Sequence, residues 1–168
     1  KQLFHNEGNG CFAEMTDPGL LGDLAQPTVA RGLAVGDYDN DGRLDVLVNN
    51  QNGPAQLFHN QVKNGNHWIR FKTVGVKSNR DGIGAKFVLI AGGVRQTAFV
   101  HGGSSYLSAS DMRVYFGLGR TPQADQVQIR WPSGRRDLLR HVKADATYIV
   151  TEGHGITGRQ PPLKKLPQ

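Results

Sequence analysis

Cysteine is almost absent from the sequence, and so are long apolar runs. Cys11 is the only cysteine among 168 residues, so no disulfide can form within the chain and a disulfide scaffold is excluded. No segment approaches the roughly 18 consecutive apolar residues of a membrane helix, so we expect no membrane span. The first residues read as a strand and show no secretory signal peptide.

Glycine, by contrast, is abundant. The 22 glycines are about twice the usual share and stand in short clusters between short apolar runs, which is typical of turns in an all-β protein. From residue 67 onward the alternation of side chains predicts strands at 67–74, 85–90, 95–100, 114–118, 126–131 and 147–150. Such a series of short strands favours a β-sandwich or a partly open β-barrel.

The charges divide unevenly along the chain. Residues 1–60 carry 8 acids and 3 bases, whereas residues 61–168 carry 6 acids and 17 bases. This asymmetry indicates two modules. The bases of the second half are scattered along strands and turns without interleaved aromatic residues, which favours a solvated face over a polyanion-binding surface.

The most specific motif is the segment DYDNDGRLD, from Asp37 to Asp45. It places carboxylates at positions 1, 3, 5 and 9 of one loop, and Gly42 allows a sharp turn between them. Closely spaced carboxylates repel one another unless a hard cation offsets their charge, and Ca²⁺ prefers six to eight oxygen ligands. We therefore expect a Ca²⁺ site formed by the set Asp37, Asp39, Asp41, the carbonyl of Arg43, and Asp45.

This loop differs from an EF-hand. Position 12 is Val48 in place of a bidentate Glu, and the flanking runs 32–36 and 46–48 read as strands, not helices. The alternative is a solvated acidic turn that caps a hairpin without metal, which four aspartates at this spacing disfavour.

A pentapeptide repeat organises the first part of the chain. The sequence QLFHN occurs at 2–6 and again at 56–60, and a period of about 50 residues with several short strands suits a β-propeller blade. We expect a partial propeller repeat at 1–62, a second β domain at 63–154 and a mobile end rich in proline and lysine at 155–168. Because blades bury their faces against neighbouring blades, we expect further blades upstream and exposed apolar side chains at positions such as Leu33 and Val48.

Two resemblances follow from these motifs. Residues 3–60, with VGDYDNDGRLD as their core, resemble the FG-GAP or VCBS repeat of integrin α-chain propellers. Residues from 78 onward resemble the ASPIC/UnbV domain, through SNRDGIGA (78–85), GGSSYLS (102–108), YFGLG (115–119) and VQIRWPSG (127–134). The pairing is similar to UnbV-type and cartilage acidic protein-like proteins, and it implies the same Ca²⁺ loop and a secreted, cell-surface or periplasmic location.

We therefore expect an all-β chain, a propeller-blade fragment followed by a sandwich or partly open barrel, with a non-enzymatic role in binding or adhesion. Its expected ligand is a protein or a glycan, and calcium stabilises the blade. One alternative is an enzyme, or an accessory protein of a biosynthetic pathway, whose active site lies in further propeller blades. A second is a polyanion-binding module that uses the basic half of the chain.

Overall fold

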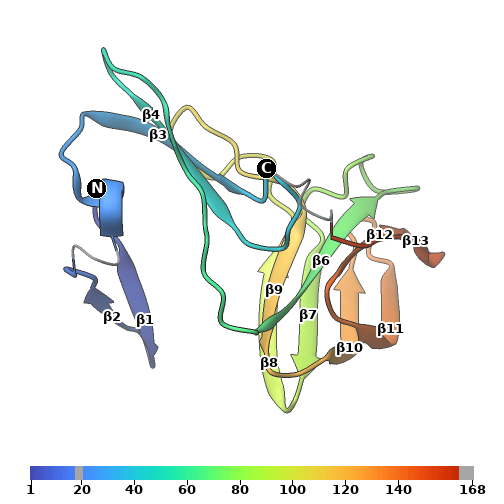
Figure 1. Cartoon of the computed structure of the whole chain (residues 1–168). Helices are drawn as coiled ribbons and strands as arrows, with labels where there is room; N and C mark the ends of the chain where they lie inside the picture. The colour runs from blue at the N-terminus through green and yellow to red at the C-terminus, as the bar shows by residue number, and fades with distance from the viewer. Residues whose placement is uncertain (18–20, 163–168) are drawn as a thin grey trace.

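The computed structural model describes residues 1–17 and 21–162, which form four antiparallel or mixed β-sheets (Figure 1). The first is a hairpin of β1 (Phe4–Gly8) and β2 (Cys11–Glu14). After a short 3-10 helix, η1 (Gly22–Ala25), comes a three-stranded sheet in the order β3-β4-β5. Its strands are β3 (Ala30–Gly36), β4 (Asp45–Asn50) and β5 (Gln56–Phe58). Within the described ranges, no helix is long and apolar enough to cross a bilayer.

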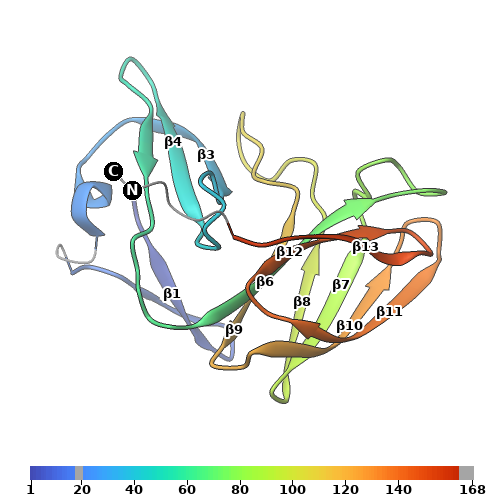
Figure 2. The ribbon, with the colours of Figure 1, turned by 45° about the vertical axis from the view of Figure 1, so that its right-hand side comes forward.

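The second half is a sandwich of two four-stranded sheets. One sheet has the order β11-β10-β7-β8, and the other has the order β13-β12-β6-β9, in which β12 and β6 run parallel. The strands are β6 (His67–Val74), β7 (Lys86–Ala91), β8 (Val94–Phe99), β9 (Val114–Gly119), β10 (Gln123–Arg130), β11 (Arg136–Lys143), β12 (Ala146–Thr151) and β13 (Gly155–Gln160). Figures 1 and 2 show the β3-β4-β5 sheet between the N-terminal hairpin and the sandwich. The expected all-β fold, with a blade-like repeat before a sandwich, is confirmed.

Alternating side chains of both sheets fill the core of the sandwich. In β7, for example, Phe87 and Leu89 are fully buried, while the alternate residues Lys86, Val88 and Ile90 are half-buried. Phe71 of β6 stacks on Phe87 across the two sheets, with ring centroids 5.3 Å apart. Trp131 is 1% exposed and belongs to this core.

Several local expectations are corrected. Two strands of the sandwich, β11 and β13, were not predicted. Residues 155–160, expected to be part of a mobile end, form β13 because they pair with β12 from Thr147↔Gln160 to Thr151↔Gly155. The rest of that expected end falls partly outside the described residues, at 163–168.

The apolar face of the blade also differs from expectation. Val48 is 1% exposed, whereas Leu47 and Leu57, which pair across β4 and β5 on the opposite face, are 46% and 50% exposed. Leu33 is 42% exposed, as expected. Because Leu33 pairs with Val48, it lies on the other face from Leu47 and Leu57, so both faces of the blade sheet carry exposed leucine.

A buried carboxylate fixes the loop that follows β6. Glu152 is 3% exposed, and it accepts hydrogen bonds from the N–H groups of Val76, Lys77 and Ser78 over 2.8, 2.7 and 2.8 Å. The hydroxyls of Ser78 and Ser133 also donate to it. Burial by itself raises the pKa of Glu152, but these hydrogen bonds outweigh burial and lower the pKa to about 2.

Replacing Glu152 by Gln is expected to destabilise the fold by about 1–3 kcal/mol, because a neutral amide cannot satisfy the same donors. Since the folded pKa is about 2 and the ordinary value is 4.5, the charged form contributes stability above pH 4.5 and loses it as the pH falls toward 2. Urea unfolding at a series of pH values should show a shallower acid loss for Glu152→Gln. Glu7→Gln on exposed β1 is the matched control, and an acid slope unchanged by Glu152→Gln would contradict the assignment.

Candidate metal site and its contact with the sandwich

The acidic loop connects β3 to β4. Asp37 follows directly after β3 and Asp45 opens β4, and the register pairs Gly36 with Asp45, so the two ends of the loop are adjacent. The turn between them uses left-handed backbone at Asn40 (φ 57°) and Gly42 (φ 95°). The predicted turn at Gly42 is confirmed.

The four aspartates come together in two overlapping groups. Carboxylate oxygens of Asp37, Asp39 and Asp45 lie within 4.8 Å of one another. Asp39 and Asp41 form a second group with His59 at the same spacing. All four predicted carboxylates therefore belong to one cluster, centred on Asp39. The fifth predicted ligand, the carbonyl of Arg43, lies in the same loop.

Backbone donors hold the carboxylates in place. Asp37 accepts from the N–H groups of Asp41 and Gly42, over 3.0 and 2.7 Å. Asp45 accepts from the N–H of Tyr38 over 3.2 Å and from the N–H of Asn60 over 2.8 Å. The loop is thus preorganised around its acidic groups, and both ends of the ligand set are tied to backbone.

The donor set fits a hard divalent cation. Ca²⁺ binds oxygen at about 2.3–2.6 Å, so two ligands of one ion stand up to about 4.6–5.2 Å apart. Carboxylate oxygens of the loop lie within 4.8 Å of one another, which is close enough for them to share one such ion. Asp37 and Asp45 are each only 2% exposed, and buried carboxylates at this distance need positive charge nearby.

His59, in the second copy of the repeated pentapeptide, lies beside the acidic cluster. Its Nε2 is buried and lies 3.3 Å from Asp39 Oδ2, without the alignment of a hydrogen bond. Asn60, the next residue, caps Asp45 as described above. The last two residues of the second pentapeptide therefore contact the acidic loop. The repeat was the sequence signal that could have linked this segment to the site. Imidazole nitrogen is a poor ligand for Ca²⁺, so we assign His59 to the wall of the site.

Arg70 of β6 forms a buried ion pair with the first carboxylate of the loop. Its Nη1 donates to Asp37 Oδ2 over 2.8 Å, and the two side chains are 3% and 0% exposed. Its Nε donates to Thr147 Oγ1 over 2.7 Å. Burial raises the pKa of Asp37, and the Gly42 N–H and the Arg70 charge oppose that rise. The sandwich thus supplies one positive charge to the acidic loop.

A second arginine of the sandwich reaches the same loop. Arg113 donates to Asn40 Oδ1 over 2.7 Å and to the carbonyl of Asp37 over 3.2 Å. Its Nε donates to Asp111 over 2.6 Å, and Tyr115 donates to the same carboxylate. Burial raises the pKa of Asp111, but the hydrogen bonds from Arg113 and Tyr115 more than offset it, so that pKa is lowered. Burial and the bond to Asp111 raise the pKa of Tyr115 to about 12.

The tip of the loop packs on an aromatic ring of the sandwich. A Cβ on Gly42 would lie 2.0 Å from the indole of Trp68, which is far below any real contact. Gly42 is therefore required for this close approach as well as for the turn. Sequence reasoning found only the second reason, because Trp68 lies 26 positions away in the chain.

The segment before β9 covers the free edge of β3. Ser108 Oγ accepts from the N–H of Leu33 over 3.2 Å and donates to its carbonyl over 2.9 Å. The N–H of Val35 donates to Ser110 Oγ over 3.1 Å, and the N–H of Asp111 donates to the carbonyl of Val35 over 2.9 Å. A loop of the sandwich therefore continues the hydrogen bonding of the blade sheet, and this loop carries no strand signal in the sequence.

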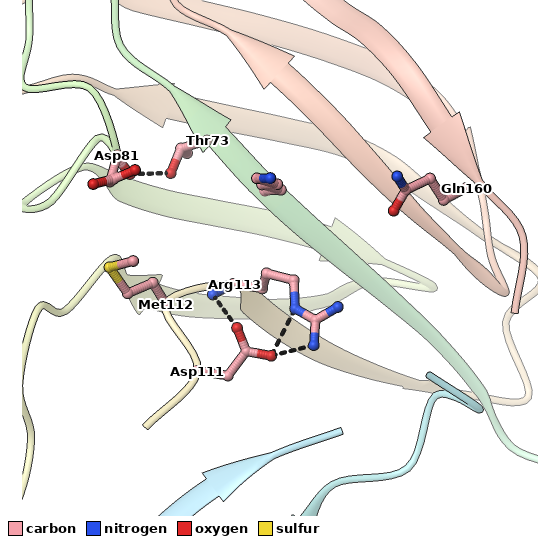
Figure 3. A pocket seen from close by; sticks show the side chains of 7 residues that line it. Thr73, Asp81, Asp111, Met112, Arg113 and Gln160 are labelled. Atoms are coloured by element: carbon pink, nitrogen blue, oxygen red, sulfur yellow. Dashed lines mark hydrogen bonds and ion pairs between the residues drawn. The ribbon is translucent and has the colours of Figure 1, made fainter. Parts of the chain in front are cut away.

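A pocket of about 360 Å³ lies next to this segment and is shown in Figure 3. Asp111 and Arg113 face each other on one side of it, and Thr73 donates to the carbonyl of Asp81 over 2.6 Å on the other. These polar groups are engaged with one another. Among the described residues, the acidic loop remains the site with the clearest chemistry, which is the binding of a hard cation.

Comparison with known proteins agrees with this division of the chain. The model of the FG-GAP-like repeat matches residues 1–48, and the model of ASPIC and UnbV matches residues 75–157. Strand β6, which carries Trp68 and Arg70, lies between the two matched segments although it belongs to the sandwich.

Among curated proteins, cartilage acidic protein 1 of Mus musculus is 35% identical over 72 residues, which are 43% of this chain and 10% of that protein. The Xenopus tropicalis and Homo sapiens proteins of the same name are 35% and 33% identical over the same lengths. The match thus spans about a tenth of each relative. The chain contains an FG-GAP-like repeat followed by an ASPIC and UnbV domain, and it is homologous to cartilage acidic protein 1 over part of its length.

Proposed function

We propose that this chain is a calcium-stabilised binding module that acts outside the cytoplasm. The single observation that carries the proposal is the acidic cluster of the β3–β4 loop, where carboxylate oxygens lie within 4.8 Å of one another. The ligands are Asp37, Asp39, Asp41, the carbonyl of Arg43, and Asp45. Arg70 pairs with Asp37, and the Arg43 side chain pairs with Asp41. Bound Ca²⁺ supplies the further positive charge that four clustered carboxylates need.

Calcium has a structural role in this proposal. The loop residues fix the turn between two blade strands, and through Asp37 and Asn40 they also fix the contact with Arg70 and Arg113. The affinity needed outside cells is only about 10⁻⁴ to 10⁻³ M, because calcium is abundant there. The homology to cartilage acidic protein 1 and the FG-GAP-like repeat support the extracellular setting.

We propose binding or adhesion as the activity, and we propose that this blade belongs to a propeller with further blades. The exposed side chains of Leu47 and Leu57 support this setting, because blades cover such faces with their neighbours. The alternative of an enzymatic activity placed its active site in those further blades, and no observation on the described residues favours it.

Calcium titration of the EDTA-treated chain tests the proposal, with Mg²⁺ as competitor. We expect saturable binding near one equivalent, weak competition by Mg²⁺, and thermal stabilisation. At calcium concentrations of about 100 Kd the stabilisation should reach about 2.7 kcal/mol. Asp39→Asn is the sharpest variant, because Asp39 is partly exposed and accepts only a long 3.4 Å bond from the loop backbone. It should fold in EDTA and lose most of the calcium-dependent rise in Tm.

Asp23→Asn, on the exposed 3-10 helix, is the matched control and should keep the full calcium response. Equal calcium responses of the two variants would place the binding elsewhere, and a wild-type chain whose melting is the same in calcium and in EDTA would refute the proposal.

A further inference from the structure

The outer face of the sheet β11-β10-β7-β8 collects positive charge. Strand alternation turns one set of side chains into the core and the other outward, and the outward set includes five bases. These are Lys86, Arg95, Arg130, Arg136 and Arg140. Asp125, at the irregular position of β10 where the register with β11 skips a pair, is the one acid beside this set among the described residues. The bases come from four separate segments of the sequence.

Three of the bases stand in one row across the sheet. The registers pair Arg130 with Arg136 on one side and with Lys86 on the other. Neighbouring strands are about 4.7–4.9 Å apart, so these like charges face one another at short range and destabilise the sheet. Arg130 and Arg136 are exposed. An anion bound across the row would relieve the repulsion.

None of the five bases forms an ion pair with a described residue. Lys86 lies over the ring of Phe99, with Nζ 5.5 Å from the ring centroid. The nearby carboxylates are engaged elsewhere: Asp137 accepts from the indole Nε1 of Trp131 over 2.7 Å, and Asp125 accepts from the N–H of Gly92 over 3.1 Å. The charge of this face is therefore uncompensated within the described chain.

A hollow of about 350 Å³ runs beside the basic row. Val88, Gln128 and Leu138 lie in the next register row and line the hollow, so an apolar floor with one amide borders the cations. Asp137 also lines it, and its carboxylate accepts the hydrogen bond from Trp131. Such a surface suits a sugar ring, which presents both apolar C–H faces and hydroxyl groups. Arginine also binds sulfate and carboxylate oxygens in a bidentate manner.

We propose that this face binds a linear acidic polysaccharide that carries sulfate or carboxylate groups. Nucleic acid fits less well, because Phe99 is the one aromatic side chain at the outward positions of these strands, and single-stranded nucleic acid needs a series of stacking rings. The choice of a glycan rests in part on the extracellular setting proposed above, but the face lies on a different sheet from the calcium loop. The two proposals can therefore fail separately.

The test uses the whole chain and a size-defined heparin oligosaccharide with a fluorescent label. Lys86→Gln/Arg130→Gln/Arg136→Gln removes the basic row. Lys63→Gln/Lys72→Gln/Lys77→Gln removes three exposed lysines elsewhere, so both triple variants carry the same formal net charge. We expect the first variant to weaken heparin binding by about ten-fold and the control by less than about three-fold. Binding by the wild type should fall between about 50 and 200 mM salt.

Circular dichroism melting shows whether each variant folds. The single variant Arg136→Gln changes one exposed residue on an edge strand, and it should weaken heparin binding by about two- to three-fold. Measurement in EDTA should give the same result as in calcium, whatever the outcome for the acidic loop. Equal losses in the two triple variants, or no heparin binding by the wild type at about 50 mM salt, would overturn the proposal. Tighter binding of single-stranded DNA than of heparin would assign the face to nucleic acid and overturn it as well.

Discussion

Replacing Arg70 by Met is expected to lower the free energy of unfolding by about 3–5 kcal/mol in EDTA, because it leaves the buried Asp37 carboxylate without its cation. The side chains of both partners are at most 3% exposed, so water cannot replace the lost charge. The variant also lacks the hydrogen bond from Arg70 to Thr147 and the contact of the Arg70 guanidinium with the Trp68 ring. Chemical denaturation monitored by tryptophan fluorescence measures the change.

Calcium should reduce this loss. If Ca²⁺ lies against Asp37, it provides the charge that Arg70 no longer supplies, and the penalty of Arg70→Met becomes smaller in calcium than in EDTA. The double variant Arg70→Met/Asp37→Asn, measured in EDTA, should be less destabilised than the sum of the single changes, because the second substitution removes the charge that the first one strands.

Arg80→Met is the matched control, since the Arg80 side chain is 90% exposed. It should change stability by no more than about 0.5 kcal/mol. Additive effects in the double variant, or a penalty for Arg70→Met as small as that of the control, would show that the ion pair does not join the blade to the sandwich.

Replacing Phe71 by Ala is expected to cost about 3–5 kcal/mol, because the ring is fully buried between the two sheets. It stacks on Phe87 with centroids 5.3 Å apart, and the rings of Tyr148 and Phe116 lie 6.1 and 6.3 Å away. The smaller side chain leaves a cavity that the paired sheets cannot close. The midpoint of urea unfolding should fall accordingly.

Phe12→Ala provides the comparison for this prediction. Phe12 is 64% exposed on the N-terminal hairpin, so its removal should change stability by less than about 1 kcal/mol. Similar effects of the two substitutions would mean that the sandwich core does not determine the stability of the chain. A change confined to Phe71→Ala would identify the sandwich as the stabilising unit.

Local sequence patterns predicted most of the sandwich strands. The alternation at 67–74 predicted β6 with its observed bounds, since successive side chains of a strand point to opposite faces of the sheet. The same reasoning missed β11, where Leu138 and Leu139 are adjacent and His141 takes a left-handed conformation (φ 50°). The irregularity at His141 interrupts the period of two that identifies a strand. Strand β13 was missed because its apolar side chains are few and its pairing with β12 supplies the order.

The basic face shows a different limit. Its bases are dispersed in the sequence, and we expected them to be solvated and scattered. The registers between β7, β10 and β11 bring Lys86, Arg130 and Arg136 into one row. Charge clustering of this kind depends on which strands are neighbours, and composition cannot reveal it.

The sequence by itself determined the all-β class, most strands, the turn at Gly42 and the grouping of four aspartates, because each of these depends on residues close together in the chain. The tertiary structure decided what surrounds that loop. Arg70 lies 33 positions from Asp37, and Ser108 lies 75 positions from Leu33, yet both pairs are in contact. Such contacts form only when a whole sheet docks on another, since the position of a side chain across a long loop depends on the packing of all the strands between. The cluster of aspartates could therefore be predicted from the sequence, whereas the arginines that pair with it could not.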